Sequence, residues 1–411
     1  MLLVKKYPFL VLMIVAFVSH QGLFAYLFQG TPLVAWKQAI GMIFMLFILV
    51  WALRDIYSVK IGISSFYSLL LVLIFAYYYL YLFSHTEFIV GYLLKLIGCA
   101  YYLYILIVFS RFNQVEFAIS IKGLFTIGSI IIIGVILDSQ TQLFQFANAT
   151  QQGLDIDLEE YRSSYLLGSS TLLFSVLSLP ILLNDVFMKM YGRKLISSTI
   201  YFLYVFMSVI AIFLSGSRSS LIYMLVFVII ALGFRLRILG YILAIIVLIA
   251  FVIYALLIGQ DTPMVMRLSS SLSADDPGNV GRIAYWYWFL GDGLSSIGDK
   301  YLLGQGLGYL ESSENIFATK HFESSFITHY VEIGIVGVVL LYSIIFLIPM
   351  WISSNALNMI WLLLMILSTI SSPSLFAYIF MISLGAGVGS FIAMHNLMNE
   401  RISQPARHLK N

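Results

Sequence analysis

Long apolar runs follow one another through most of this sequence, and they constrain the fold more than any other feature. Runs such as 8–28 and 238–259 have the length of about 20 residues that an α-helix needs to cross the hydrocarbon core of a bilayer. Helices satisfy their backbone hydrogen bonds internally, as the hydrocarbon requires. Only 10% of the residues are charged, against roughly 25% in soluble domains. We therefore predict an all-α polytopic membrane protein.

The lengths of these runs predict about twelve transmembrane helices. They are expected at about 8–28, 33–53, 61–84, 88–110, 117–137, 163–183, 195–214, 219–234, 238–259, 324–350, 356–370 and 375–394. The segment 215–218 is interpreted as a tight surface turn, because one long helix would place Arg218 in the middle of the bilayer at a cost of at least about 2.5 kcal/mol. Gly216 provides the backbone freedom for that turn.

These helices divide the chain into four regions. Residues 1–259 form the first nine helices with an outer loop near 138–162, 260–322 a large catalytic loop, 323–394 the last three helices and 395–411 a tail. Lys and Arg are more frequent in alternate loops, which predicts that both termini are cytoplasmic and both long loops are external. In a bacterium, the large loop of this inner-membrane protein would face the periplasm or the cell exterior, and its aromatic segment after Arg282 is expected to form an interfacial helix.

Arginines near the outer surface are the first candidates for chemistry. Arg218 follows small hydroxyl residues, and a guanidinium has a rigid fork of donors that suits phosphate oxygens. The alternative for Arg218 is a snorkelling anchor at the lipid headgroups. Arg282 and Lys37, which follows Trp36 at the start of the second span, have the same two interpretations, and their positions do not separate them.

His321 and Glu323 lie where the large loop returns to apolar sequence. Glu323 beside a helix N-terminus is a good cap, because the helix end favours a carboxylate. The functional alternative is a base that removes a proton from a sugar hydroxyl. His329 and Glu332, further along the same segment, are interpreted as packed polar residues, although polar groups in a span are functional candidates by default.

Several functional classes lack their motifs here. The sequence contains no GxxxxGK[ST], no HExxH and no DxD pair, which argues against an ATP-driven pump, a zinc protease and a metal-dependent transferase using nucleotide sugars. The single cysteine, Cys99, excludes a disulfide framework within the chain. We expect no cofactor, no metal and no nucleic-acid partner. A lipid-pyrophosphate donor, with arginines in place of a metal, fits these observations.

Several short motifs together resemble the O-antigen polymerase and O-antigen ligase superfamily, and their spacing covers nearly the whole chain. They are Ser215-Gly216-Ser217-Arg218-Ser219-Ser220, Gly281-Arg282 with Trp286, Gly304-Gln305-Gly306-Leu307-Gly308, Glu323-Ser324-Ser325-Phe326, Glu332-Ile333-Gly334-Ile335-Val336-Gly337 and Trp36-Lys37. The ligases have a histidine where this chain has Glu323, and His321 lies two positions earlier. This difference favours a polysaccharide polymerase and leaves the base open between Glu323 and His321.

The resemblance implies about a dozen helices and a metal-independent transfer of a growing glycan from undecaprenyl pyrophosphate to a new lipid-linked repeat unit, to make O-antigen or capsular polysaccharide. It implies that Arg218 and Arg282 bind pyrophosphate and that Glu323 or His321 is the base. The expected partners are the lipid-linked oligosaccharide, the bilayer, a chain-length regulator and a flippase. The alternatives are a ligase that transfers finished glycan to lipid A-core or another acceptor, and a flippase or transporter. Detectable internal repeats would favour a transporter, and we find none.

Overall fold

The computed structural model describes residues 89–141, 167, 170–236, 242, 249, 286–287, 302–306, 324–353, 355–371 and 378–403, which are helical with short connections and contain no strand. The α-helices are α6 (Ile89–Ser110), α7 (Gln114–Thr141), α9 (Leu173–Tyr191), α10 (Ser198–Leu214), α11 (Arg218–Leu236), α16 (Ser325–Tyr342), α17 (Ile348–Ile352), α18 (Ala356–Ser371) and α19 (Tyr378–Ser403). A 3₁₀ turn, η4 (Ser170–Leu172), precedes α9, and a π-helical turn, η8 (Ser343–Leu347), joins α16 to α17.

Within the described part of the chain, five helical segments are long and apolar enough to cross a membrane. They are Gln114–Ser139, Ser170–Tyr191, Arg218–Leu236, Ser325–Ile352 and Ile379–Asn399. Apolar side chains on their outer faces remain exposed, including Ile133 of α7 and Ile222 of α11. Such faces fit a lipid environment, and the predicted all-α membrane class is confirmed for the described residues. The number of twelve helices stays a prediction.

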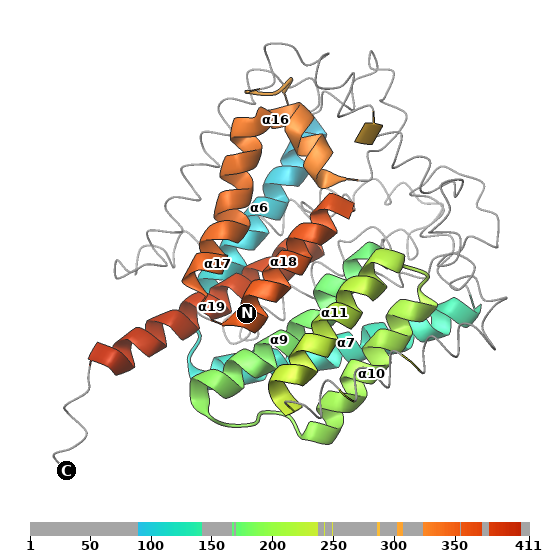
Figure 1. Ribbon diagram of the computed structural model, residues 1–411, viewed down its shortest axis with the longest axis vertical. Helices are drawn as coiled ribbons and strands as arrows, with labels where there is room; N and C mark the ends of the chain where they lie inside the picture. Colours follow the sequence, from blue (N-terminus) through green and yellow to red (C-terminus); the bar gives the residue numbers. More distant parts are fainter. Residues whose placement is uncertain are drawn as a thin grey trace.

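The described helices pack around α9 and α19, which also contact each other (Figure 1). α9 contacts α7, α10 and α11, and α19 packs along α6. Small residues allow this second contact to be close. A Cβ on Gly385 would lie 2.7 Å from the carbonyl oxygen of Tyr102, and a Cβ on Gly389 would lie 2.6 Å from that of Leu106. Glycines four residues apart therefore form a seam where the two backbones touch, as at other membrane helix interfaces.

The tight turn predicted between two helices is present. Gly216 has a φ of 72°, and the Ser215 hydroxyl donates to the carbonyl of Ile212 over 2.7 Å. The N–H of Leu221 donates to the carbonyl of Ser217 over 3.0 Å, which makes Ser217 the residue before the first helical position. α11 therefore begins with Arg218 at one end and has Arg235 in its last turn, about 26 Å away along the axis.

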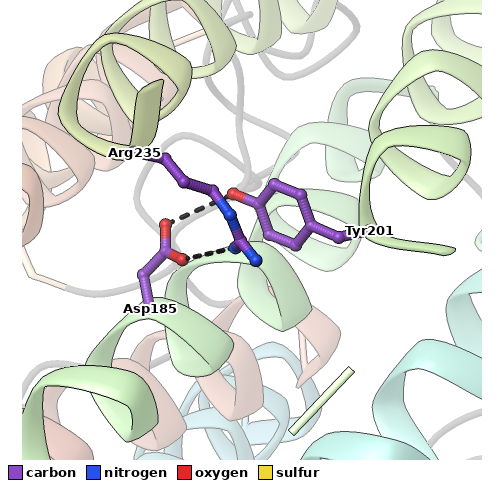
Figure 2. A network of polar contacts seen from close by, with 3 residues as sticks. All are labelled: Asp185, Tyr201 and Arg235. Atoms are coloured by element: carbon purple, nitrogen blue, oxygen red, sulfur yellow. Dashed lines mark hydrogen bonds and ion pairs between the residues drawn. The ribbon is translucent and has the colours of Figure 1, made fainter. Parts of the chain in front are cut away.

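A buried ion pair lies at the Arg235 end of α11 (Figure 2). Arg235 Nη1 contacts Asp185 Oδ1 of α9 at 3.1 Å, and both side chains are 7% exposed. The Tyr201 hydroxyl of α10 donates to the other oxygen of Asp185 over 3.3 Å, and the guanidinium lies over the Tyr201 ring at 3.8 Å. The spans expected from the sequence, 219–234 and 238–259, predicted that Arg235 lies in a loop. In the structure this pair joins three helices, because helices α9 and α11 continue past the ends expected from hydropathy alone.

α16 contains a sharp reversal that hydropathy did not predict. Gly334 has φ 66° and ψ −179° between two helical stretches, and Figure 1 shows the helix turning back at this point. The rings of Phe326 and Tyr342 lie 5.9 Å apart, whereas a straight helix would separate these positions by about 24 Å. We call residues 325–333 the first arm and 335–352 the second arm of a helical hairpin. The expected span at 324–350 is therefore not one continuous helix, and Ser325–Ile352 qualifies as a candidate span by length and composition alone.

Candidate functional site

Arg218 is the predicted site residue whose position the structure describes. It is half-buried at the first position of α11, next to Ser217, which is 4% exposed. The Ser217 hydroxyl makes no hydrogen bond to any described residue. A buried hydroxyl without a partner is costly, and a polar ligand bound beside Arg218 would offset that cost.

The first turn of α11 adds to the positive potential at this place. Backbone N–H groups in the first turn of a helix have no acceptor inside the helix, and the helix end is equivalent to about half a positive charge. The Ser220 hydroxyl donates to the carbonyls of Ser170 and Thr171, each over 3.1 Å, and so ties this turn to η4. A fixed helix start with a guanidinium and a buried hydroxyl is suited to bind an anion such as phosphate.

A second part of the candidate site is formed where the glycine-rich segment 302–306 contacts the turn of the α16 hairpin. The N–H of Gln305 donates to the carbonyl of Val331, and the N–H of Gly306 donates to the carbonyl of Glu332, each over 2.9 Å. Those carbonyls lose their helical partners because the helix reverses at Gly334. The segment therefore supplies the hydrogen bonds that the reversal removes, which backbone groups within a membrane protein require.

Two glycines make this contact possible. Gly304 has a φ of 82°, and a Cβ on it would lie 2.3 Å from the carbonyl oxygen of Glu332. Gly334 would place a Cβ 2.3 Å from the carbonyl oxygen of Leu302. The N–H of Val336 donates to that same oxygen over 3.2 Å. The glycine-rich motif and the Glu332–Gly337 motif of the sequence are thus two halves of one backbone contact.

Trp286 connects a third motif to the same hairpin. Its ring stacks on that of Phe326 in the first arm, with centroids 6.4 Å apart and planes at 17°. Phe326 is two residues after Ser324, whose hydroxyl accepts from the N–H of Ile327 as the N-cap of the first arm. Trp286 therefore lies beside the start of the first arm.

The last turns of α18 lie between α11 and the hairpin. The Tyr223 hydroxyl of α11 donates to the carbonyl of Leu367 over 3.0 Å and to the Ser371 hydroxyl over 2.9 Å. From the other side, the Tyr342 hydroxyl bonds to Thr369 over 3.2 Å. Both tyrosines thus bond to residues 367–371. The end of α18 is therefore bonded to α11, which begins with Arg218, and to the second arm of the hairpin.

His329 and Glu332 both lie in the first arm and are buried, at 2% and 0% exposure. The His329 ring contacts that of Tyr342 in the second arm at 6.4 Å. The sequence interpretation of these two residues as packed polar groups agrees with their burial. Lys37, Arg282, His321 and Glu323 lie outside the described residues, and their roles stay predictions.

No group of three or more His, Cys, Asp or Glu side chains is placed to hold a metal ion in the part of the chain that the structure describes. Sequence reasoning did not identify Tyr223, Tyr342 or Thr369, because aromatic and hydroxyl residues are frequent throughout this sequence. It did not identify the reversal at Gly334 either. The signal available for that reversal was a glycine inside the apolar run, which by itself is compatible with a straight helix.

Residues 203–342 match the family whose description is O-antigen ligase. The matched region begins in α10 and ends with α16. It contains Ser217 and Arg218, Trp286, the glycine-rich segment 302–306 and the motifs 323–326 and 332–337. No curated protein matches this sequence.

Proposed function

Residues 203–342 belong to the O-antigen ligase and polymerase superfamily, and from this premise we propose that the protein polymerises lipid-linked oligosaccharide repeat units. The donor would be a glycan on undecaprenyl pyrophosphate, and the product would be O-antigen or a capsular or exopolysaccharide. The reaction would take place at the outer face of the bacterial inner membrane, with both termini in the cytoplasm. The proposed partners are a flippase that delivers the units and a chain-length regulator.

The observation that supports this proposal most directly is the arrangement of the family-matched region. The region contains three separate motifs, around Arg218, Trp286 and Gly304. Trp286 and Gly304 contact the hairpin directly. Arg218 begins α11, which bonds to the end of α18, and the hairpin bonds to that same end. Enzymes that transfer glycosyl groups from a lipid diphosphate need cations near the leaving group and a base near the acceptor. The start of α11 is suited to the first role, and the residues before the first arm are suited to the second.

In the proposed reaction, the hydroxyl oxygen of the acceptor sugar attacks the anomeric carbon of the donor glycan. The bond between that carbon and the pyrophosphate oxygen breaks as the new glycosidic bond forms, and undecaprenyl pyrophosphate leaves. Glu323 or His321 takes the proton of the acceptor hydroxyl. Arg218, Arg282 and Lys37 would bind the pyrophosphates and stabilise the charge on the leaving group without a metal ion. An inverting displacement is the simplest course.

Ser217 would contribute to the same phosphate site. Its buried hydroxyl has no partner among the described residues, and it lies at the start of α11, where N–H groups and the helix dipole favour an anion. A bound phosphate oxygen would accept its hydrogen bond and remove the cost of burying it.

Glu323 favours a polymerase over the related ligase, because the ligase pattern has a histidine at that position. The ligase, which would transfer finished glycan to lipid A-core or another acceptor, is the second candidate. A flippase is the third. It requires charges along a cavity through the membrane, whereas Arg218, the proposed site cation within the described residues, is at a helix end.

The experiment that tests the proposal is the glycan profile of a deletion strain, together with its lipid-linked intermediates. Loss of the polysaccharide ladder, with single repeat units still transferred to the surface, is the expected result. Long lipid-linked polymer that is not transferred to its acceptor would identify a ligase. Single lipid-linked units retained on the cytoplasmic side would identify a flippase and would overturn the assigned roles of Arg218 and Glu323.

A further inference from the structure

We infer that the end of α18 positions the two halves of the proposed site, and that the hydroxyls of Tyr342 and Tyr223 are its positioning residues. This inference rests on the proposed function. We use the name α18 brace for residues Leu367, Thr369 and Ser371, which accept hydrogen bonds from both sides.

The hydrogen bonds of α18 leave its hydroxyls available as acceptors for the two tyrosines. The Thr369 hydroxyl donates its proton to the carbonyl of Ile366 over 2.7 Å, so the Tyr342 hydroxyl donates to Thr369. The Ser371 hydroxyl likewise donates to the carbonyl of Ser368 over 3.3 Å. The single hydroxyl proton of Tyr223 is shared between the carbonyl of Leu367 and the hydroxyl of Ser371. The two tyrosines depend on acceptors that α18 holds in place.

Tyr342 connects the end of α18 to the first arm of the hairpin. Its ring contacts Phe326 at 5.9 Å and His329 at 6.4 Å, and Phe326 also stacks on Trp286. In the chain, Glu323 is followed by Ser324, the N-cap residue of the first arm. A shift of the Tyr342 ring would therefore move the start of the first arm, where the proposed base is attached.

Tyr223 has the corresponding role for the phosphate side. It lies five residues after Arg218 on the same helix, about 7.5 Å along the axis. Its ring contacts Phe174 of α9 at 5.8 Å, and its hydroxyl is bonded to the brace. The last two turns of α18 therefore contact both the helix of Arg218 and the hairpin. Their position sets the spacing between the guanidinium of Arg218 and the start of the first arm.

The chemistry of the proposed reaction makes this spacing important. Acceptor hydroxyl, anomeric carbon and leaving oxygen must be in line, and a misplacement of about 1 Å can lower the rate by roughly 100-fold. Loss of a positioning bond is therefore expected to lower kcat while leaving ground-state binding, and hence KM, nearly unchanged.

The test uses full-length protein in proteoliposomes and lipid-linked repeat units extracted from the deletion strain. Tyr342→Phe removes the hydroxyl and keeps the ring contacts. Thr369→Val removes the acceptor and keeps the shape, and Thr369→Ser keeps the acceptor. We expect Tyr342→Phe and Thr369→Val each to lower kcat by about tenfold or more, with KM within about twofold of wild type. The double variant should be no slower than either single variant. Thr369→Ser should have the wild-type rate, in contrast to Thr369→Val.

Tyr201→Phe is the matched control, because it removes a tyrosine hydroxyl bond at the Asp185 end of the bundle. It should retain the wild-type kcat per folded molecule. Wild-type kcat in Tyr342→Phe and Thr369→Val, or an equal loss of kcat in Tyr201→Phe, would overturn the inference. Failure of the proposed function gives a different result, since the wild-type protein would then not elongate the repeat units.

Discussion

Gly334 lies against Gly304 so closely that a Cβ on Gly334 would be 2.6 Å from the backbone nitrogen of Gly304. Both glycines have a positive φ, at 66° and 82°. The contact links the glycine-rich segment 302–306 to the reversal of α16 through backbone atoms alone. It follows that neither position tolerates a side chain, and that the hairpin depends on a segment about 30 residues before it in the chain.

Gly334→Ala and Gly304→Ala are therefore expected to disrupt the hairpin and abolish polysaccharide synthesis. Alanine at positive φ costs roughly 1–2 kcal/mol, and here its Cβ would also contact backbone atoms that cannot move aside. The matched control is Gly192→Ala, because Gly192 also has a φ of 66°, but a Cβ on it would meet no atom within 4 Å. The measurements are the amount of protein in the membrane, its Tm in detergent and the glycan ladder.

The control shows the effect of alanine at a left-handed position with free space around it. Gly334 has a ψ of −179°, against 11° for Gly192, so it adds a backbone conformation that is almost limited to glycine as well as the close approach. Gly192→Ala should lower Tm slightly and leave the ladder intact, whereas the two hairpin variants should lose it. An intact ladder in Gly334→Ala would mean that the reversal of α16 is not needed for function.

Replacement of the cationic residues should abolish transfer without removing the protein from the membrane. We expect Arg218→Ala and Arg282→Ala each to lower activity by about 100-fold or more, as for the loss of other charge-stabilising groups. Arg218→Lys should be nearly as inactive, because an ammonium lacks the planar fork of donors. Ser217→Ala should lower activity by about tenfold, the effect of one hydrogen bond to a charged group. The assay is elongation of extracted lipid-linked units by purified protein.

Arg193→Ala is the control for this series, since Arg193 is exposed beyond the end of α9, at the far end of the bundle. It should retain full activity. Full activity in Arg218→Ala or in Arg282→Ala would remove that arginine from the mechanism.

The buried pair Asp185–Arg235 is expected to affect stability and not the chemical step. Arg235→Met leaves a buried carboxylate without its cation, which typically costs about 3–5 kcal/mol. The double variant Asp185→Leu/Arg235→Met removes both charges and should recover most of that loss. Thermal unfolding in detergent provides the measurement. A Tm of the double variant as low as that of the single variant would show that the pair itself stabilises the fold.

The α6–α19 seam gives a prediction about assembly of the bundle. A Cβ at Gly385 or Gly389 would lie within 2.7 Å of a carbonyl oxygen of α6, so Gly385→Ala and Gly389→Ala must separate the two backbones. Such overpacking costs roughly 1–3 kcal/mol. We expect a lower Tm with normal kcat per folded molecule, because the seam is formed by helices outside the family-matched region. Unchanged Tm in both variants would contradict the seam.

The amino-acid sequence by itself determined the all-helical membrane class of the described residues and the separation of α10 from α11. Apolar length and the cost of a charge in hydrocarbon are local properties, which hydropathy measures directly. For that reason Arg218 was correctly expected at a helix end. The sequence also contained the motifs that resemble the O-antigen polymerase and ligase superfamily, and the family match over residues 203–342 confirms the superfamily. The Trp36-Lys37 motif lies outside the matched residues.

The tertiary structure alone decided how those motifs meet. The length of an apolar run does not indicate whether the segment reverses. The hairpin at Gly334 depends on hydrogen bonds from Gln305 and Gly306, which are distant in the sequence, so only the tertiary structure revealed it. The pairing of Asp185 with Arg235, and of Tyr342 with Thr369, joins residues far apart in the chain. Such contacts arise from the packing of whole helices, because each buried polar group must find its partner on a neighbouring element, and local sequence does not specify which element that is.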